Sequence, residues 1–173
     1  MSNLNELRNI ADGFLGQYPE DQAWNGSPFN WMRRLPPGSK HVIGRSMLAV
    51  LLNRNGMTAT LSKGQIRVNG NGVSVKVALM WKEGIIKFQN ITDTDFDYLF
   101  CLALYPHKAF GWIIPKTDLW KDGKVNKAHH PSVTSQHKGA DCWVHIDPAN
   151  PAPWLAAYGG TIDQAIAITK KSV

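Results

Sequence analysis

The strongest constraint on the fold is a change in hydrophobic period at Gly56. Before this residue, from Ser39 to Asn55, apolar side chains recur at helical spacing, and after it they alternate as in β-strands. The sequence NGNG at 69–72 is typical of a tight turn between two antiparallel strands. A helix followed directly by a hairpin predicts a mixed α/β domain and excludes an all-helical domain.

The same patterns predict the order of elements along the chain. An amphipathic helix is expected over 3–18, and a second helix is expected to begin at Ser39 and to end at Asn55-Gly56. Its inward face is predicted to carry Val42, Ile43, Met47, Val50 and Leu51. Strands are expected at 57–61, 65–68, 73–80, 85–89, 97–105, 110–115 and 142–146, and a final helix at 161–170.

Residues 97–105 form a nearly continuous apolar run, which is typical of a strand buried on both faces. The prediction is therefore a central mixed sheet built from about 57–115. The 39–55 helix should cover one face and the terminal helices should flank the sheet. With 173 residues, no repeats and no linker, the chain is expected to be a single domain over 1–173.

Composition favours a cytoplasmic protein without a membrane partner. No apolar run approaches the roughly 20 residues that span a bilayer, and the N-terminus does not have the pattern of a signal peptide. Cys101 and Cys142 lie in apolar, strand-like runs without CxxC spacing, so we expect reduced cysteines in or near the core.

Charge is distributed unevenly along the chain. The net charge is +6, and no acidic residue occurs between Gln22 and Lys82. The basic residues of this stretch are Arg33, Arg34, Lys40, Arg45, Arg54, Lys63, Arg67, Lys76 and Lys82. A solvated surface normally mixes both signs, whereas sustained positive charge suits the neutralisation of phosphates. The pattern favours an anionic partner; the alternative is a basic surface that only keeps the protein in solution.

Short motifs within 73–116 follow one another in a recognisable order. They are Lys76, Trp81, Lys87-Phe88-Gln89, Phe96-Asp97 and Trp112-Ile113-Ile114-Pro115-Lys116, followed in the tail by Gly139-Ala140-Asp141, Pro153-Trp154-Leu155 and Gly159-Gly160. In this order and spacing the chain resembles, from about 39 to 168, the PD-(D/E)XK superfamily of restriction-endonuclease-like proteins. The resemblance implies a restriction-endonuclease-like α/β core with a central mixed sheet and flanking helices.

The resemblance also implies a site for Mg²⁺, in which carboxylates hold the ion and a metal-activated water attacks the phosphodiester. The acidic positions of the family fall on Gln65 (within two residues), Ser74 and Arg45, and none of these is acidic. Lys76 and Gln89 are interpreted as remnants of the active site. Lys76 taken alone would be interpreted as an exposed strand lysine. We therefore expect no metal site and no cofactor.

These observations lead to the hypothesis of a catalytically silent nuclease fold that binds double-stranded DNA, as a subunit or regulator in a restriction, anti-restriction or mobile-element system. The residues expected to contact DNA are Arg33, Arg34, Lys40, Arg45, Lys63, Arg67, Lys76, Lys82 and Lys87. One alternative is an active Mg²⁺-dependent endonuclease whose acids come from Glu83, Asp93, Asp95 or a partner subunit. Another is a nuclease-derived module that binds protein, and a homodimer or a protein partner is compatible with each hypothesis.

Tryptophan and histidine provide two further expectations. Trp81, Trp112, Trp143 and Trp154 lie beside apolar runs and are predicted to be core residues, whereas Trp24, Trp31 and Trp120 lie in loops near basic residues and could stack on bases. The side chains His129, His130, His137, His145 and Cys142 do not have the spacing of a compact zinc site.

Overall fold

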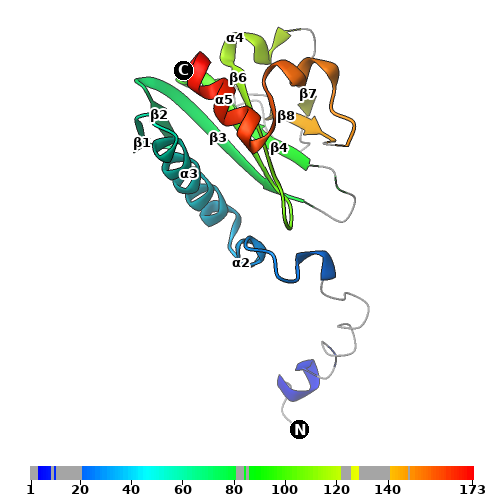
Figure 1. Ribbon diagram of the computed structural model, residues 1–173. Coiled ribbons are helices and arrows are strands. Elements are labelled where there is room, and N and C mark those ends of the chain that lie inside the picture. The colour runs from blue at the N-terminus through cyan, green and yellow to red at the C-terminus, as the bar shows by residue number, and fades with distance from the viewer. Residues whose placement is uncertain are drawn as a thin grey trace.

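The computed structural model describes residues 4–8, 10, 21–80, 84, 86–121, 126–128, 141–147 and 149–173. Its helices are α2 (Asn30–Arg33), α3 (Pro37–Arg54), α4 (Lys116–Leu119) and α5 (Ile162–Ser172), with short 3₁₀ helices η1 (Gln22–Trp24) and η3 (Pro153–Ala157) (Figure 1). Its strands are β1 (Ala59–Ser62), β2 (Gln65–Val68), β3 (Asn71–Leu79), β4 (Ile86–Ile91), β5 (Tyr98–Leu104), β6 (Ala109–Pro115), β7 (Asn126–Ala128), β8 (Asp141–Ile146) and β9 (Gly159–Thr161). The mixed α/β class is confirmed.

Six strands form a mixed sheet in the order β1-β2-β3-β5-β6-β9, in which only β3 and β5 are parallel neighbours. The expected strand at 85–89 exists as β4, but its predicted place in the central sheet is wrong. β4 belongs to a second sheet, in the order β4-β8-β7. Parallel neighbours must be joined by a crossover. β4 is part of the crossover that joins β3 to β5, so it lies outside the sheet that contains these two strands.

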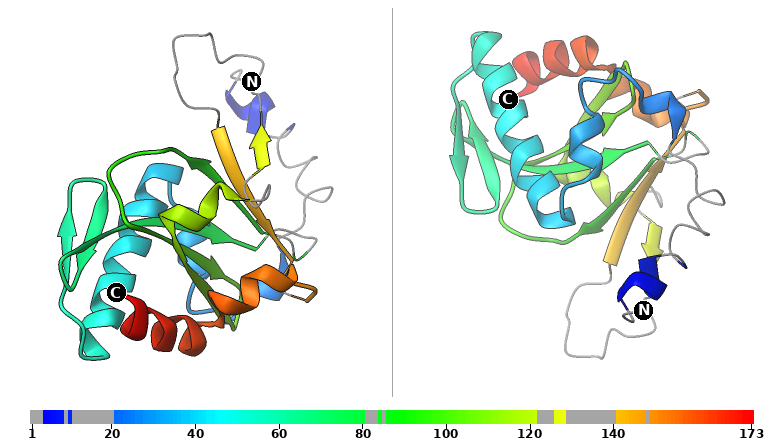
Figure 2. Two further views of the ribbon diagram at one scale, coloured as in Figure 1. Left: turned by 90° about the horizontal axis from the view of Figure 1, so that it is seen from above. Right: turned by 90° about the horizontal axis from the view of Figure 1, so that it is seen from below.

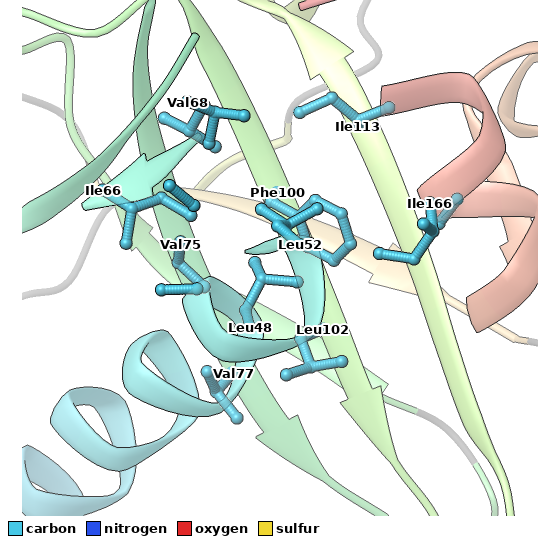
Figure 3. Close-up of a cluster of buried hydrophobic side chains, with 14 of the residues drawn as sticks. Leu48, Leu52, Ile66, Val68, Val75, Val77, Phe100, Leu102, Ile113 and Ile166 are labelled. Atoms are coloured by element: carbon cyan, nitrogen blue, oxygen red, sulfur yellow. The ribbon is translucent and has the colours of Figure 1, made fainter. Parts of the chain in front are cut away.

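The six-stranded sheet separates two hydrophobic cores. Along β5, Phe100, Leu102 and Leu104 face a core shared with α3 and α5, while Leu99, Cys101 and Ala103 face a core shared with β4 and β8. This two-sided burial explains the continuous apolar run, as predicted. Both helices therefore cover one face and the second sheet covers the other (Figure 2). Figure 3 shows the helix-side core, with Leu48 and Leu52 of α3 above the strands and Ile166 of α5 beside them.

Helix α3 differs from its prediction in two respects. It begins at Pro37, with no side-chain cap, instead of at Ser39, because proline is already suited to the first helical position. Its predicted inward face is only partly right: Ile43, Met47 and Leu51 pack against the core, but Val42 and Val50 are 52% and 51% exposed. The buried residues of the helix are Gly44, Leu48, Ala49 and Leu52. Because the helix is apolar nearly all round, the period could not identify the buried face. The predicted end at Asn55-Gly56 is confirmed, with Gly56 at a φ of 80°.

The two termini behave differently. Helix α5 begins with a capping box between Thr161 and Gln164, and its end is tied to the sheet by hydrogen bonds from Asn71 Nδ2 to the Val173 carbonyl and from the Tyr98 hydroxyl to the Ser172 carbonyl. At the other terminus, 4–8 and 10 are helical, but their apolar side chains do not pack on the sheet. None of the helices in the described part of the chain is long and apolar enough to span a bilayer.

Candidate nucleic-acid interface

The residues at the expected acidic positions of β2 and β3 share one face of the six-stranded sheet. Val73, Val75 and Val77 of β3 are buried beneath α3, so the alternation of the strand directs Ser74 and Lys76 to the opposite face. On β2, Ile66 is buried in the same helix-side core, so Gln65 also lies on the face of Ser74. Both Gln65 and Ser74 are half-buried.

On this face of the sheet, the side chain of Lys76 contacts β4. Its Nζ donates a hydrogen bond of 2.6 Å to the carbonyl of Asn90, at an irregularity of β4 where Asn90 has a φ of 56°. Gln89 precedes Asn90 and is exposed. The structure therefore brings the strand of Gln89 to Lys76, although the contact is made by the neighbouring carbonyl. Burial lowers the pKa of Lys76, an effect that the adjacent Cys101 opposes. Cys101 is a buried free thiol, as predicted.

An acid that the sequence did not assign to the site is Asp97. Its Oδ2 accepts a hydrogen bond of 2.7 Å from the Gly72 amide, and its own amide donates to the Gly72 carbonyl at 2.8 Å. A Cβ at Gly72 would lie 3.1 Å from Gln65 Oε1 and 3.5 Å from Asp97 Oδ2, so both side chains lie over this glycine. The only signal in the sequence was the Phe96-Asp97 pair before the buried strand.

Three other acids were named for this site in the endonuclease alternative: Glu83, Asp93 and Asp95. Asp93 lies 2.8 Å from Lys116 in an ion pair, and Asp95 is exposed in the same loop. Glu83 lies outside the described residues. Within the part of the chain that the structure describes, no three His, Cys, Asp or Glu side chains gather as metal ligands. Asp97 is thus the acid that the fold places beside Gln65.

A group of basic side chains lies at one edge of the sheet. β2 pairs with β3 only over Asn71–Val73, whereas β5 pairs with β3 as far as Leu79. Lys76 therefore lies on the part of β3 that extends beyond the β1–β2 hairpin. His41 of α3 is close enough that Lys76 and Arg45 lower its pKa, in addition to the larger effect of partial burial.

Arg45 links this group to the β1–β2 turn. It is half-buried on α3, and a Cβ at Gly64 would lie 4.0 Å from its Nη1. Its Nε is buried and has no hydrogen-bond acceptor among the described residues. Lys63, the exposed residue before Gly64, lies in the same turn. We call His41, Arg45, Lys63 and Lys76 the edge cluster. No described acidic side chain forms an ion pair with any of its members.

The remaining basic residues predicted to contact DNA do not join the edge cluster in one patch. Arg33 lies 3.8 Å from Asp21 and stacks over Trp24, and the Arg67 guanidinium donates to the Gly70 carbonyl at the opposite end of the hairpin. Arg34 is exposed after α2, and Lys40 is half-buried in the first turn of α3. Lys87 is exposed on β4 between two buried neighbours, Ile86 and Phe88, and Lys82 lies outside the described residues.

The tryptophans fall only partly as predicted. Trp112 is buried and Trp154 half-buried, but Trp24, expected to be available for stacking, is fully buried. Its burial follows from packing of the 21–35 loop, where Arg33 covers the indole. Trp31 is 50% exposed, with its indole N–H bonded to the Pro28 carbonyl, and Trp120 is half-buried. Trp81 and the side chain of Trp143 lie outside the described residues, as do His129, His130, His137 and the Cys142 side chain; His145 is exposed.

Comparison with known proteins identifies no relative. The chain matches no protein-family model, no curated protein and no solved structure.

Proposed function

We propose that the protein binds double-stranded DNA through its phosphates and does not hydrolyse it. The observation that carries this proposal is the edge cluster: His41 and Arg45 on α3, Lys63 in the β1–β2 turn and Lys76 on the opposite face of β3 lie around one edge of the sheet. No described acid forms an ion pair with any of them. Unpaired cations at a surface attract phosphates, and each contact releases a condensed counterion. The same cations repel Mg²⁺, which requires oxygen ligands with negative charge to replace its water.

A restriction-endonuclease-like core is part of this proposal. Helix α3, the antiparallel strands β1, β2 and β3, and the buried strands β5 and β6 follow in the order that the resemblance implies. Ser74 and Lys76 share a face, which the acid-x-Lys pattern of that superfamily requires. A silent protein of this kind would act on DNA in the cytoplasm, as a subunit or regulator of a restriction, anti-restriction or mobile-element system.

Asp97 favours one alternative, an active Mg²⁺-dependent endonuclease. A carboxylate beside the Gln65 amide oxygen, on the sheet face that also carries Ser74 and Lys76, provides part of a magnesium site, and a bound phosphate would contribute further oxygens. However, Asp97 Oδ2 already accepts the Gly72 amide, and no second described carboxylate accompanies it. The charge balance therefore favours binding without cleavage.

The two functions are separated by incubating the protein with plasmid and short duplexes, with Mg²⁺, Mn²⁺ or EDTA, and measuring cleavage and mobility shift together. We expect a shift that is unchanged by EDTA and no nicking with either metal. Calorimetry with Mn²⁺ should detect no binding at the Gln65–Asp97 site. Metal-dependent nicking that Asp97→Asn or Lys76→Ala abolishes would establish the endonuclease. The absence of both a mobility shift and nicking would instead favour the third hypothesis, a module that binds protein.

Duplex binding should also strengthen as pH falls. Partial burial, Lys76 and Arg45 hold the pKa of His41 below its usual 6.5, so the imidazole is neutral at pH 7. A neighbouring phosphate favours the protonated form, so binding is coupled to proton uptake below about pH 6.5. We expect a several-fold gain in affinity between pH 7.5 and pH 5.5 in fluorescence anisotropy, since one added cation contributes about one phosphate contact.

His41→Gln should remove most of this pH dependence and leave the affinity at pH 7.5 nearly unchanged. His107→Gln is the matched control, because His107 is an exposed histidine outside the edge cluster. If both variants retain the pH dependence of the wild type, protonation of His41 is not linked to binding.

A further inference from the structure

The sequence contains the dipeptide Asn-Gly four times, and the structure places the four copies in different environments. The copies are Asn25-Gly26, Asn55-Gly56, Asn69-Gly70 and Asn71-Gly72. In this dipeptide the glycine amide nitrogen can attack the side-chain carbonyl carbon of asparagine, because glycine has no side chain to hinder the approach. Hydrogen bonds at the glycine amide or at the asparagine side chain oppose the attack. The hydrogen bonding of the four copies therefore indicates which of them is reactive.

Asn55-Gly56, at the end of α3, is held at both reacting groups. The Gly56 amide donates a hydrogen bond of 3.0 Å to the Asn53 carbonyl. Asn55 Nδ2 donates one of 2.8 Å to the Leu51 carbonyl. Both hydrogen bonds must break before the nitrogen reaches the carbon, so the reaction is expected to be slow at this copy.

Asn71-Gly72, at the start of β3, is held in the same way. The Gly72 amide donates a hydrogen bond of 2.7 Å to Asp97 Oδ2, and Asn71 Nδ2 donates one of 3.0 Å to the Val173 carbonyl. Gly72 is also buried. This copy is therefore expected to be slow as well.

Asn69-Gly70 connects β2 to β3 and is held through its asparagine. The Thr58 amide donates a hydrogen bond of 3.0 Å to Asn69 Oδ1, and the Asn69 amide donates one of 2.9 Å to the Thr58 carbonyl. The side chain of Asn69 must leave Thr58 before its carbonyl carbon can approach the Gly70 amide. These two bonds therefore protect the third copy.

Asn25-Gly26 lies in a turn in which both reacting groups are accessible. Asn25 has a φ of −64° and a ψ of 129°, Gly26 has a φ of 71°, and the Ser27 amide donates to the Trp24 carbonyl at 3.0 Å. These are the angles and the hydrogen bond of a type II turn, in which the central amide takes no part in the turn's own hydrogen bond. Among the described residues, neither the Gly26 amide nor the Asn25 side chain has a hydrogen-bond partner. Both residues are exposed.

We propose that Asn25 is a site of spontaneous deamidation in the folded protein, with water as the co-reactant. The Gly26 amide nitrogen loses its proton to solvent base and forms a bond to Asn25 Cγ. The bond between Cγ and Nδ2 breaks, and Nδ2 takes up a proton and leaves as ammonia. Water then opens the cyclic imide at one of its two carbonyl carbons. Attack at Cγ gives aspartate, and attack at the main-chain carbonyl gives isoaspartate, in which the chain continues through Cβ.

Both products change the loop that contains the turn. Each replaces a neutral amide by a carboxylate in the segment that carries Arg33 and Arg34, so the net charge of the protein falls. Isoaspartate also lengthens the main chain within the turn that follows the fully buried Trp24. The reaction requires only the turn and water, so it is independent of the proposed binding of DNA.

The test is to incubate the full-length protein in mildly alkaline buffer made with ¹⁸O-labelled water and to locate the label by proteolysis and fragmentation mass spectrometry. The label enters only where hydrolysis occurs during the incubation, so earlier deamidation is not counted. The reference is the same protein unfolded in urea. Asn25 should react at nearly the same rate in both states. The other three asparagines should each react about tenfold or more slowly in the folded protein, because hydrogen bonds must first break.

Substitution of single asparagines provides a second measurement, by isoelectric focusing of the incubated protein. Asn25→Gln should remove the rapid gain of negative charge, because the longer side chain closes a ring more slowly. Asn55→Gln is the matched control and should retain it, and circular dichroism verifies that both variants are folded. Protection of Asn25 equal to that of the other copies would overturn the proposal. Faster reaction at another copy, or an unchanged gain of charge in Asn25→Gln, would overturn it too.

Discussion

Duplex DNA binding should weaken roughly a hundredfold at moderate salt when three members of the edge cluster lose their charge, since each removes one phosphate contact. The variant is Arg45→Gln, Lys63→Gln and Lys76→Met, which retains most of the volume of each side chain. The logarithm of affinity should also depend less steeply on the logarithm of salt concentration, by about one unit for each lost contact. Fluorescence anisotropy of a labelled duplex at several salt concentrations measures both quantities.

The matched control removes three lysines that lie elsewhere. Lys108, Lys170 and Lys171 are exposed and outside the edge cluster, so their joint replacement by glutamine lowers the net charge equally. It should change the affinity and the salt slope much less than the edge-cluster variant does. Equal losses in the two triple variants would show that binding depends on overall charge and not on this edge of the sheet. Thermal unfolding of each variant excludes loss of the fold as the cause.

The fold was predicted best where a segment's own pattern determines its environment. The alternation of β3 and the continuous apolar run of β5 each matched the burial that the structure shows. An alternating pattern indicates that one face of a strand is buried, and a continuous apolar run indicates that both faces are. The end of α3 at Asn55 was also predictable, since Gly56 adopts the positive φ of a helix terminus. These signals are local, and they do not specify which strand becomes a neighbour of which.

The errors in the fold concern relations between segments. The direct pairing of β3 with β5 removed β4 from the central sheet, and no feature of 85–89 alone determines that pairing. Two side chains assigned to the inward face of α3, Val42 and Val50, are exposed, because valines and leucines surround the helix. The residue that fixes the orientation is Gly44, which a hydrophobic pattern does not count. Trp24 was assigned to an exposed loop, although its loop packs onto the indole and buries it.

For the candidate site, the sequence indicated residue types but not their arrangement. Ser74 and Lys76 could be placed on one face from alternation alone, and Gln65 followed from the hairpin. Asp97 reaches the site across 25 positions of sequence, and Lys76 meets Asn90 across 14, so only the folded chain reveals these contacts. Nine basic residues were expected to contact DNA, but two of them, Arg33 and Arg67, make other contacts. The edge cluster also includes His41, which the charge count omitted.

We expect a substitution where α3 packs against β3 to destabilise the protein more than any other change in the helix. Gly44→Ala, at this contact, should lower the free energy of unfolding by about 2 kcal/mol. A Cβ at Gly44 would overlap Val77 Cγ2 and would lie 2.9 Å from Val77 Cγ1, so α3 must shift away from the strand.

The matched control is Gly38→Ala in the same helix, where a Cβ has no neighbour within 4 Å; this change should stabilise by up to about 1 kcal/mol, because alanine favours the helix. Denaturant unfolding of both variants measures the difference.

Combining Gly44→Ala with Val77→Ala should recover part of the lost stability, since the second change removes the overlapping methyl groups and the two sites then couple. Because His41 and Arg45 flank Gly44, a shifted helix should also weaken duplex binding, whereas Gly38→Ala should not. An unfolding free energy for Gly44→Ala equal to that of Gly38→Ala would show that α3 does not rest on Val77, and the positions of both cations would then need to be assigned again.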